Sequence, residues 1–371
     1  MGRIVFFLTL IAAGLAIALF VFDGDVPTGG QTYAQSSGNF GLRQTSSPDA
    51  STASPPAAVS TPVSASPSQS PINRCVNMGG ALEAENEGDW GYTIRRSDFT
   101  RIRAMGFDTV RIPVKWSAHA DPLPPYSIDP SLFTRVDTVA KQAIDAGLQP
   151  IIDVHHYDDI NEDPKGHTPR LMAIWKQISE HYANWPDDLI FELLNEPHTE
   201  LTAKRIDKLN RALLRQVRET NPDRWVILGG GNWGSLEGLM ETNPPYDPRA
   251  IVTFHYYEPF EFTHQGAPWA WKKVPLGQTW GTSEDRQDVV AHLTAAARWQ
   301  EKVGMPVFLG EFGVYVEVDD TQRAQYVEFV RRTSERLGMG WCYWDWGTTL
   351  GMYNLERETL HPGFQTALFA D

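Results

Sequence analysis

Cysteine and positive charge are both scarce in this chain of 371 residues. Only Cys75 and Cys342 are present, which excludes a scaffold built on disulfides, and no Cys-x-x-Cys pair indicates zinc. Lys and Arg number 32 against 46 Asp and Glu, for a formal net charge of -14. Because phosphate binding needs a basic face, nucleic acid is excluded as a partner, whereas a neutral ligand is compatible with this charge.

Signatures of common cofactor sites are also missing. No Gly-x-Gly-x-x-Gly turn follows the first expected strand, and the run Gly229-Gly230-Gly231 has no Lys-Ser/Thr after it to bind a phosphate. Nothing is spaced like His-Glu-x-x-His, and the pair His155-His156 has no third clustered donor for zinc. We therefore expect neither a cofactor nor a metal.

The N-terminal part of the chain differs in composition from the rest. Arg3 precedes the apolar run Ile4–Phe22, which predicts a signal peptide or an N-terminal membrane anchor over residues 1–34. Residues 35–72 are rich in Ser, Pro, Thr and Ala and predict a disordered linker. Residues 73–371 then form one folded domain, which is exported and either secreted, periplasmic or tethered to the membrane.

Short apolar runs alternate with longer amphipathic stretches across this domain. The expected strands are Cys75–Gly79, Thr109–Val114, Gln149–Val154, Leu189–Leu194, Trp225–Gly229, Ile251–His255, Val307–Gly310 and Gly340–Tyr343. The expected helices are Pro130–Ala146, Leu171–Ala183, Leu201–Glu219, Glu284–Val303 and Thr321–Leu337. Eight strands alternating with helices predict the α/β fold of a (β/α)8 TIM barrel, with a doubly wound open sheet as the alternative.

Polar side chains follow the expected strands where each one ends, which is the functional face of such a barrel. Glu196 follows the fourth strand and Glu311 the seventh, so the two carboxyl groups would face each other across the barrel mouth. Cleavage of a glycosidic bond with retention needs two carboxyl groups about 5–5.5 Å apart. Arg111 would keep a nucleophilic Glu ionised, Tyr257 would donate a hydrogen bond to it, and Asn195 is placed for a sugar 2-hydroxyl.

Several of these strand-end motifs resemble those of glycoside hydrolase family 5, in its cellulase branch. They include Leu-Asn-Glu-Pro at 194–197, Gly-Glu-Phe-Gly at 310–313, Asp-Val-His-His-Tyr at 153–157 and the stretch from Phe254 to Gly266. The resemblance covers the chain from about Arg74 to the C-terminus. It implies Glu196 as acid/base and Glu311 as nucleophile. It also implies substrate contacts from Arg111, His155, His156, Asn195, His255, Tyr257, His264, Trp269, Trp344, Asn77 and Glu83.

One position departs from the pattern of this branch. Where the branch usually reads Asn-Leu-Gly-Asn-Ala-Leu-Glu, this chain reads Asn-Met-Gly-Gly-Ala-Leu-Glu over residues 77–83. Gly80 therefore removes one polar side chain near the first strand. The departure bears on the choice of sugar and leaves the two expected catalytic residues in place.

These observations predict a monomeric, retaining endo-β-1,4-glucanase whose partner is a β-linked polysaccharide or oligosaccharide. A β-mannanase or a mixed glucan and mannan hydrolase on the same scaffold is the alternative, since the two sugars differ at the C2 hydroxyl. A carbohydrate-binding protein without activity is a further hypothesis, but a pure binder has no need for both glutamates.

The two cysteines fall on the first and eighth expected strands, which become neighbours when a barrel closes. Cys75 shares its parity with Asn77, and Cys342 shares its parity with Trp344, so both side chains are expected to point inward. A disulfide is geometrically conceivable in an oxidising compartment. We expect buried free thiols in preference to this bridge.

Overall fold

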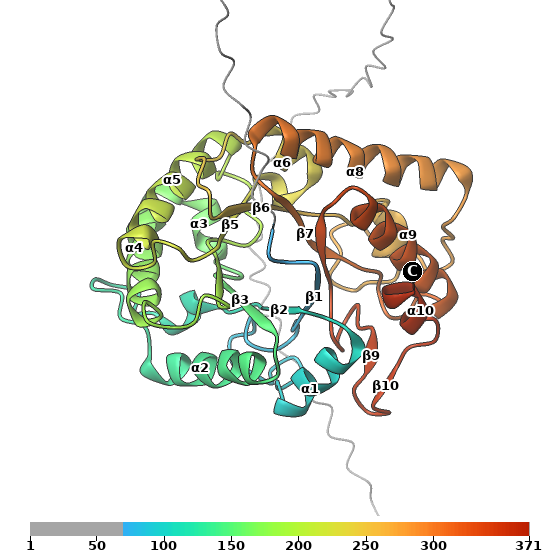
Figure 1. Ribbon diagram of the computed structural model, residues 1–371, viewed down its shortest axis with the longest axis horizontal. Coiled ribbons are helices and arrows are strands. Elements are labelled where there is room, and N and C mark those ends of the chain that lie inside the picture. The colour runs from blue at the N-terminus through green and yellow to red at the C-terminus, as the bar shows by residue number, and fades with distance from the viewer. Residues whose placement is uncertain (1–69, 371) are drawn as a thin grey trace, which may run out of the picture. The chain divides into compact units, whose positions relative to one another are not determined.

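Eight parallel strands form a closed barrel in the computed structural model, which describes residues 70–370 (Figure 1). The strands are β1 (Arg74–Asn77), β2 (Thr109–Ile112), β3 (Gln149–Asp153), β4 (Ile190–Glu192), β5 (Val226–Gly229), β6 (Ala250–His255), β7 (Val307–Phe312) and β8 (Gly340–Tyr343). Neighbours in sequence are neighbours in the barrel, and β1 pairs with β8 to close it. The predicted (β/α)8 barrel is thus confirmed, and every predicted strand coincides with an observed one.

Helices surround the strands on the outside of the barrel (Figure 1). They are α1 (Arg96–Met105), α2 (Pro130–Asp145), α3 (Asp158–Glu162), α4 (Pro164–His181), α5 (Ala203–Thr220), α6 (Leu236–Glu241), α7 (Phe260–Thr263), α8 (Ser283–Val303), α9 (Asp320–Arg336) and α10 (Phe364–Phe369). Short 3-10 turns occur at Trp116–His119 and Asn232–Gly234, and a small hairpin joins β9 (Tyr353–Asn354) to β10 (Thr359–Leu360).

The five predicted helices are confirmed as α2, α4, α5, α8 and α9. Their ends carry ordinary capping groups: Asp129 accepts a hydrogen bond from the Ser131 amide at the start of α2, and Gly304 ends α8 in the left-handed conformation. Helix α1 was not predicted, because its sequence is mostly polar. Only Asp98, Phe99 and Ile102 of α1 are buried.

The interior of the barrel is built from side chains at alternate strand positions, since successive residues of a strand face opposite sides. One interior layer is apolar and consists of Ile72, Cys75, Ile151, Ile190, Trp225, Ile227, Ile251, Phe308 and Cys342. Two residues further along their strands, Asn77, Arg111, Asp153 and Glu192 are also buried. A polar layer therefore lies directly above the apolar one, toward the ends of the strands where function is expected.

Cys75 and Cys342 form a disulfide, so the expectation of free thiols was wrong. The two residues are register partners on β1 and β8, with their Cα atoms 4.1 Å apart. Sequence spacing placed them on adjacent strands but could not fix their register, and register decides whether two sulfur atoms meet. The bridge joins the first and last strands of the barrel across 267 residues.

The predicted signal or anchor over residues 1–34 lies outside the described residues, as does the predicted linker up to residue 69. The last residues assigned to the linker belong to the packed domain, because Ile72 is 1% exposed and lies in the apolar interior layer. Among residues 70–370, no helix combines the length and hydropathy that a membrane crossing requires.

Candidate active site

Arg111 on β2 lies at the centre of the polar layer and is completely buried. Its Nε and Nη2 atoms donate to the two carboxylate oxygens of Glu192 at 2.6 and 2.8 Å, a bidentate pair. Nη2 also lies 2.7 Å from Asp153 Oδ2. Nη1 donates to Glu311 Oε1 at 2.9 Å. One guanidinium therefore fixes three carboxylates that come from three different strands.

Two amide side chains complete the surroundings of Arg111. Nη1 donates to Asn77 Oδ1 at 2.9 Å, and Nη2 donates to Asn195 Oδ1 at 2.7 Å. Asn77 also donates to the carbonyl oxygens of Gly310 and Tyr343. Because Asn77 is fully buried with its amide engaged in this way, it lies below the site and orients Arg111. Asn195 is 6% exposed, and its side chain is hydrogen-bonded to Glu196; an amide nitrogen has two hydrogens, so it can also donate to a ligand.

Glu311 lies on β7 and is held from several sides. Besides Arg111, the hydroxyl of Tyr257 donates to Glu311 Oε2 at 2.9 Å, and His255 Nδ1 lies 3.5 Å from the same oxygen. The Glu311 side chain is 6% exposed. Its carboxyl group is therefore fixed in position, with one oxygen on a cation and the other on a hydroxyl.

Glu196 stands in the loop after β4 and is the more open of the two carboxyl groups. Its Oε1 atom lies 2.7 Å from His255 Nδ1, and its side chain is 30% exposed. Glu196 has a positive φ of 45°, a conformation that is costly for residues with a side chain and tends to occur at functional sites. The strained backbone directs this carboxyl group toward β7.

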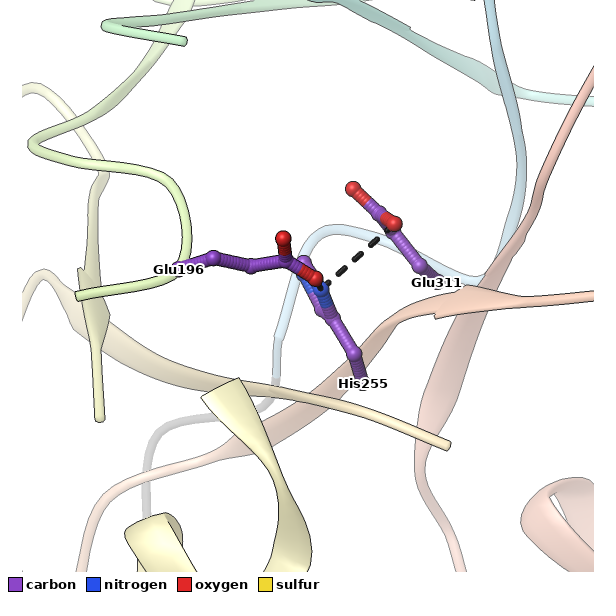
Figure 2. Close-up of side chains that lie close together, drawn as sticks. All are labelled: Glu196, His255 and Glu311. Carbon is purple, nitrogen blue, oxygen red and sulfur yellow. Dashed lines mark hydrogen bonds and ion pairs between the residues drawn. The ribbon is translucent and has the colours of Figure 1, made fainter. Parts of the chain in front are cut away.

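Figure 2 shows that the two carboxyl groups point toward each other, with His255 of β6 between them. One carboxylate oxygen of each Glu and one ring nitrogen of His255 all lie within 4.8 Å of one another. These three atoms could in principle hold a cation. However, Arg111 already supplies a fixed positive charge to Glu311, so the site has its counter-ion without a metal. The expected absence of a metal stays a prediction.

Burial dominates the acidity of the pair. It raises the pKa of Glu311 to about 7; the charge of Glu196 adds to the rise, while His255, Arg111 and Tyr257 oppose it. Burial raises the pKa of Glu196 as well. Arg111 does favour the ionised form of Glu311, as expected from the sequence, but this effect is smaller than that of burial. Two repelling carboxyl groups at this separation lose their protons in two steps that belong to the pair.

His155 and Trp344 form one wall next to the carboxyl pair. His155 Nδ1 lies 2.7 Å from Asp153 Oδ2, and the His155 ring stacks on Trp344 with 5.7 Å between ring centroids. Burial lowers the pKa of His155 well below its usual range and lowers that of His255 as well. Both rings are therefore neutral around pH 7 and can donate or accept hydrogen bonds.

The remaining predicted residues lie further out. His156 packs against His155 and Trp90, with ring centroids at 4.5 and 5.8 Å. Glu83 is 1% exposed, and its carboxylate accepts hydrogen bonds from the amides of Gly80 and Ala81. Burial raises the pKa of Glu83 to about 7, although these amides oppose the rise. Glu83 therefore shapes the loop after β1, and its contact with a substrate stays a prediction.

His264 and Trp269 lie on the segment that follows β6. The His264 ring stacks on Phe260 and contacts Tyr257, with centroid distances of 4.4 and 5.0 Å, and burial lowers its pKa to about 4. Trp269 is 49% exposed and meets Tyr315 edge-on at 5.1 Å. His264 thus supports Tyr257, whereas Trp269 presents an open aromatic face beside the site.

Sequence reasoning missed two residues that the site depends on, Asp153 and Glu192. Both are buried, and both bind Arg111. The signal was available, because each is an acidic residue within a run that is otherwise apolar and too buried to tolerate an unpaired charge. An inward-facing Arg111 on a neighbouring strand was the partner that this pattern required.

The fold and the site together define a class of protein. A (β/α)8 barrel with two carboxyl groups facing each other at its mouth is an arrangement suited to glycoside hydrolysis. The model of the family Cellulase (glycosyl hydrolase family 5) matches residues 74–349. The chain belongs to this family.

Individual relatives agree with the family. Endoglucanase H of Acetivibrio thermocellus is 37% identical over 299 residues, which are 79% of this chain and 32% of that protein. Endoglucanase A of Ruminococcus albus is 30% identical over 76% of this chain and 82% of its own length. The chain thus spans about a third of the first relative and most of the second.

Solved structures show the same similarity. Thermotoga maritima Cel5A in complex with cellobiose is 38% identical, with a TM-score of 0.78 over 80% of this chain and 97% of that one. Its structure with mannotriose matches equally well, with the same identity, coverage and TM-score. The resemblance noted in the sequence is therefore confirmed at the level of family and fold.

Proposed function

We propose that this protein hydrolyses internal β-1,4 links of a glucan with retention of anomeric configuration. The observation that carries the proposal is the approach of Glu196 and Glu311, whose nearest carboxylate oxygens lie within 4.8 Å. Retaining hydrolases hold their carboxyl groups about 5–5.5 Å apart, whereas inverting enzymes need about 6.5–9.5 Å for a water molecule. The short separation favours direct attack by one carboxylate.

The contacts of each carboxyl group support the assignment of roles. When the pair holds one proton, the negative charge is best placed on Glu311, which has Arg111 and the Tyr257 hydroxyl as partners. The proton then stays on Glu196, whose side chain is partly open toward a ligand. Glu311 is thus suited to be the nucleophile and Glu196 to be the general acid.

The reaction proceeds by double displacement. Glu311 attacks the anomeric carbon while Glu196 gives its proton to the leaving glycosidic oxygen, so that a glycosyl ester forms on Glu311 and the glycosidic bond breaks. Glu196, now ionised, takes a proton from water, and the water oxygen displaces Glu311 from the anomeric carbon. Asn195, held by Arg111, is placed to donate to the 2-hydroxyl of the reacting sugar.

A comparison of leaving groups tests these roles. The Glu196→Ala variant should lose activity on β-glucan but keep much of its glycosylation rate on an aryl β-cellobioside, because a good leaving group needs no proton. Glu311→Ala should lose activity on both substrates. Equal losses by both variants on both substrates would contradict the separate roles.

A hydrolase of both glucan and mannan is the second candidate. It is favoured by the similarity to a structure that has been solved with cellobiose and with mannotriose. Rates on carboxymethylcellulose, mixed-linkage glucan, glucomannan and pure mannan decide between the candidates. Faster turnover of pure mannan than of any glucan would reject the glucanase.

A further inference from the structure

A hollow of about 310 Å³ lies among the loops at the mouth of the barrel, and its lining residue Trp90 packs against His156, the neighbour of His155. The loops that follow β1, β6, β7 and β8 line it, with Trp90, Trp269, Tyr315 and Thr348 among its walls. Trp90 and Trp269 are each about half exposed, at 54% and 49%. Large exposed aromatic side chains around a hollow are typical of a binding site, because leaving them in water is costly.

This hollow belongs to the side of the barrel that carries Glu311. Glu311 lies on β7, and the lining loops follow β7 itself, its neighbours β6 and β8, and β1, whereas Glu196 follows β4 on the other side. In the proposed reaction, Glu311 keeps the sugar whose anomeric carbon it attacks. A sugar in the hollow would therefore belong to the part of the polysaccharide substrate that stays on the enzyme after the first step.

Gly80 and Thr348 meet at the edge of this hollow. Gly80 has a φ of +80°, and a Cβ atom added to it would lie 2.5 Å from Thr348 Cγ2 and 2.9 Å from Thr348 Oγ1. Both distances are too short for non-bonded atoms. The side chain of Thr348 thus fills the space that any side chain at position 80 would need.

Thr348 cannot turn away from Gly80 without loss. Its hydroxyl donates to Asp345 Oδ2 at 2.9 Å, and its amide donates to Asp345 Oδ1 at 2.6 Å. Asp345 is completely buried, so loss of the hydroxyl would leave its Oδ2 atom with only the longer hydrogen bond from the Leu350 amide, at 3.2 Å. Thr348 is therefore fixed, with its γ-methyl group toward Gly80.

We infer that Gly80 and Thr348 act as one specificity-determining pair for the sugar retained on Glu311. This inference rests on the proposed function. Thr348 lines the hollow, and a side chain at position 80 would displace the Thr348 side chain from its place there. With Trp90 and Trp269 among its lining residues and no basic side chain there, the hollow fits an uncharged pyranose. Position 80 can accept a side chain only if residue 348 becomes smaller.

The test compares four variants with the wild type on cellotetraose. Gly80→Asn adds a polar side chain from a residue type that tolerates positive φ. It should raise KM about tenfold through the clash with Thr348. Adding Thr348→Ala to this variant removes the two shortest contacts and should bring KM back toward the value of Thr348→Ala alone. Gly338→Asn is the matched control: Gly338 has a φ of +72°, no atom within 4 Å of an added Cβ, and lies outside the hollow.

An unchanged KM for Gly80→Asn would overturn the pair, as would the same rise in KM with Thr and with Ala at position 348. Titration of the same variants with cellotetraose in a Glu311→Gln background measures binding without hydrolysis. A loss of binding in Gly80→Asn that Thr348→Ala restores would support the pair. If the wild type bound cellotetraose but hydrolysed no glucan, the result would instead contradict the proposed function.

Discussion

Two layers of the same barrel interior differ in chemistry although they are only two residues apart along each strand. The lower layer holds Cys75, Ile151, Ile190 and Ile251, with the Cys75–Cys342 disulfide joining β1 to β8 where the barrel closes. The upper layer holds Asn77, Arg111, Asp153 and Glu192 at the next inward positions of β1 to β4. The lower layer needs no partners for its side chains, whereas every charge in the upper layer is paired.

This contrast separates the tasks of the two layers. Burial of apolar area stabilises the lower layer without demanding precise geometry. Buried ions are costly, and a layer of them persists only when each has its partner. The upper layer thus costs stability, but it fixes Glu311 and Asn195 beside the substrate. Substitutions in one layer should therefore change stability alone, and those in the other should change stability and activity together.

Arg111→Met should produce the largest effect. It removes the one cation that Glu192, Asp153 and Glu311 share, and a buried carboxylate without its partner costs about 3–5 kcal/mol. The kcat should fall about a hundred- to a thousandfold, because Glu311 loses its counter-ion and Asn195 its support. Urea unfolding and steady-state kinetics measure the two losses.

The control for this variant lies in the lower layer. Ile251→Val should cost about 1 kcal/mol of unfolding free energy and leave kcat unchanged in the folded protein. If Ile251→Val lowered kcat as strongly as Arg111→Met, the two layers would not have separate tasks.

Removal of the disulfide should have the next largest effect. The double change Cys75→Ala with Cys342→Ala frees the ends of a loop of 267 residues and should cost about 2–5 kcal/mol. Well below the unfolding temperature, kcat should match that of the wild type, because the bridge lies in the lower layer. Thermal unfolding of the variant and of the oxidised and reduced wild type provides the measurement. Equal unfolding temperatures for all three proteins would show that the disulfide does not stabilise the fold.

Tyr257→Phe should produce the smallest effect, a shift in pH dependence. The Tyr257 hydroxyl donates to Glu311 and so lowers its pKa; without this bond the pKa rises above its already raised value. Because Glu311 must be ionised to attack, the acidic limb of kcat/KM should move to higher pH, by about half to one unit.

The neighbouring tyrosine gives the matched control. The hydroxyl of Tyr256 lies 2.9 Å from His292, away from the carboxyl pair, so Tyr256→Phe should leave the acidic limb in place. A shift of the limb toward lower pH in Tyr257→Phe, or an equal shift in both variants, would contradict the role of the Tyr257 hydroxyl.

The features that local sequence determines were predictable. Short apolar runs located all eight strands, longer amphipathic stretches located the five long helices, and polar residues after strands located Glu196 and Glu311. Helix α1 was missed because its buried face is narrow, with Phe99 and Ile102 as its only buried apolar side chains. Its stability depends on packing against the barrel, which the pattern of α1 does not express.

Contacts between distant strands were less predictable. Local sequence does not define the register between β1 and β8, so the bond between Cys75 and Cys342 was not expected. Nor could it show that Asn77 and Glu83 are almost completely buried, since both motif positions are compatible with a ligand contact. The steric exclusion between Gly80 and Thr348 joins residues 268 positions apart and emerges only from the packed structure.

The proposed reaction requires Glu311 to act as the nucleophile that forms a covalent bond to the sugar. An aryl 2-deoxy-2-fluoro-β-cellobioside slows the second step and should accumulate the glycosyl enzyme, which mass spectrometry of the digested protein can locate. We predict one added disaccharide on the peptide that contains Glu311. An adduct on the peptide that contains Glu196, or hydrolysis of an unmodified cello-oligosaccharide to a product of inverted configuration, would contradict the role of Glu311 as nucleophile.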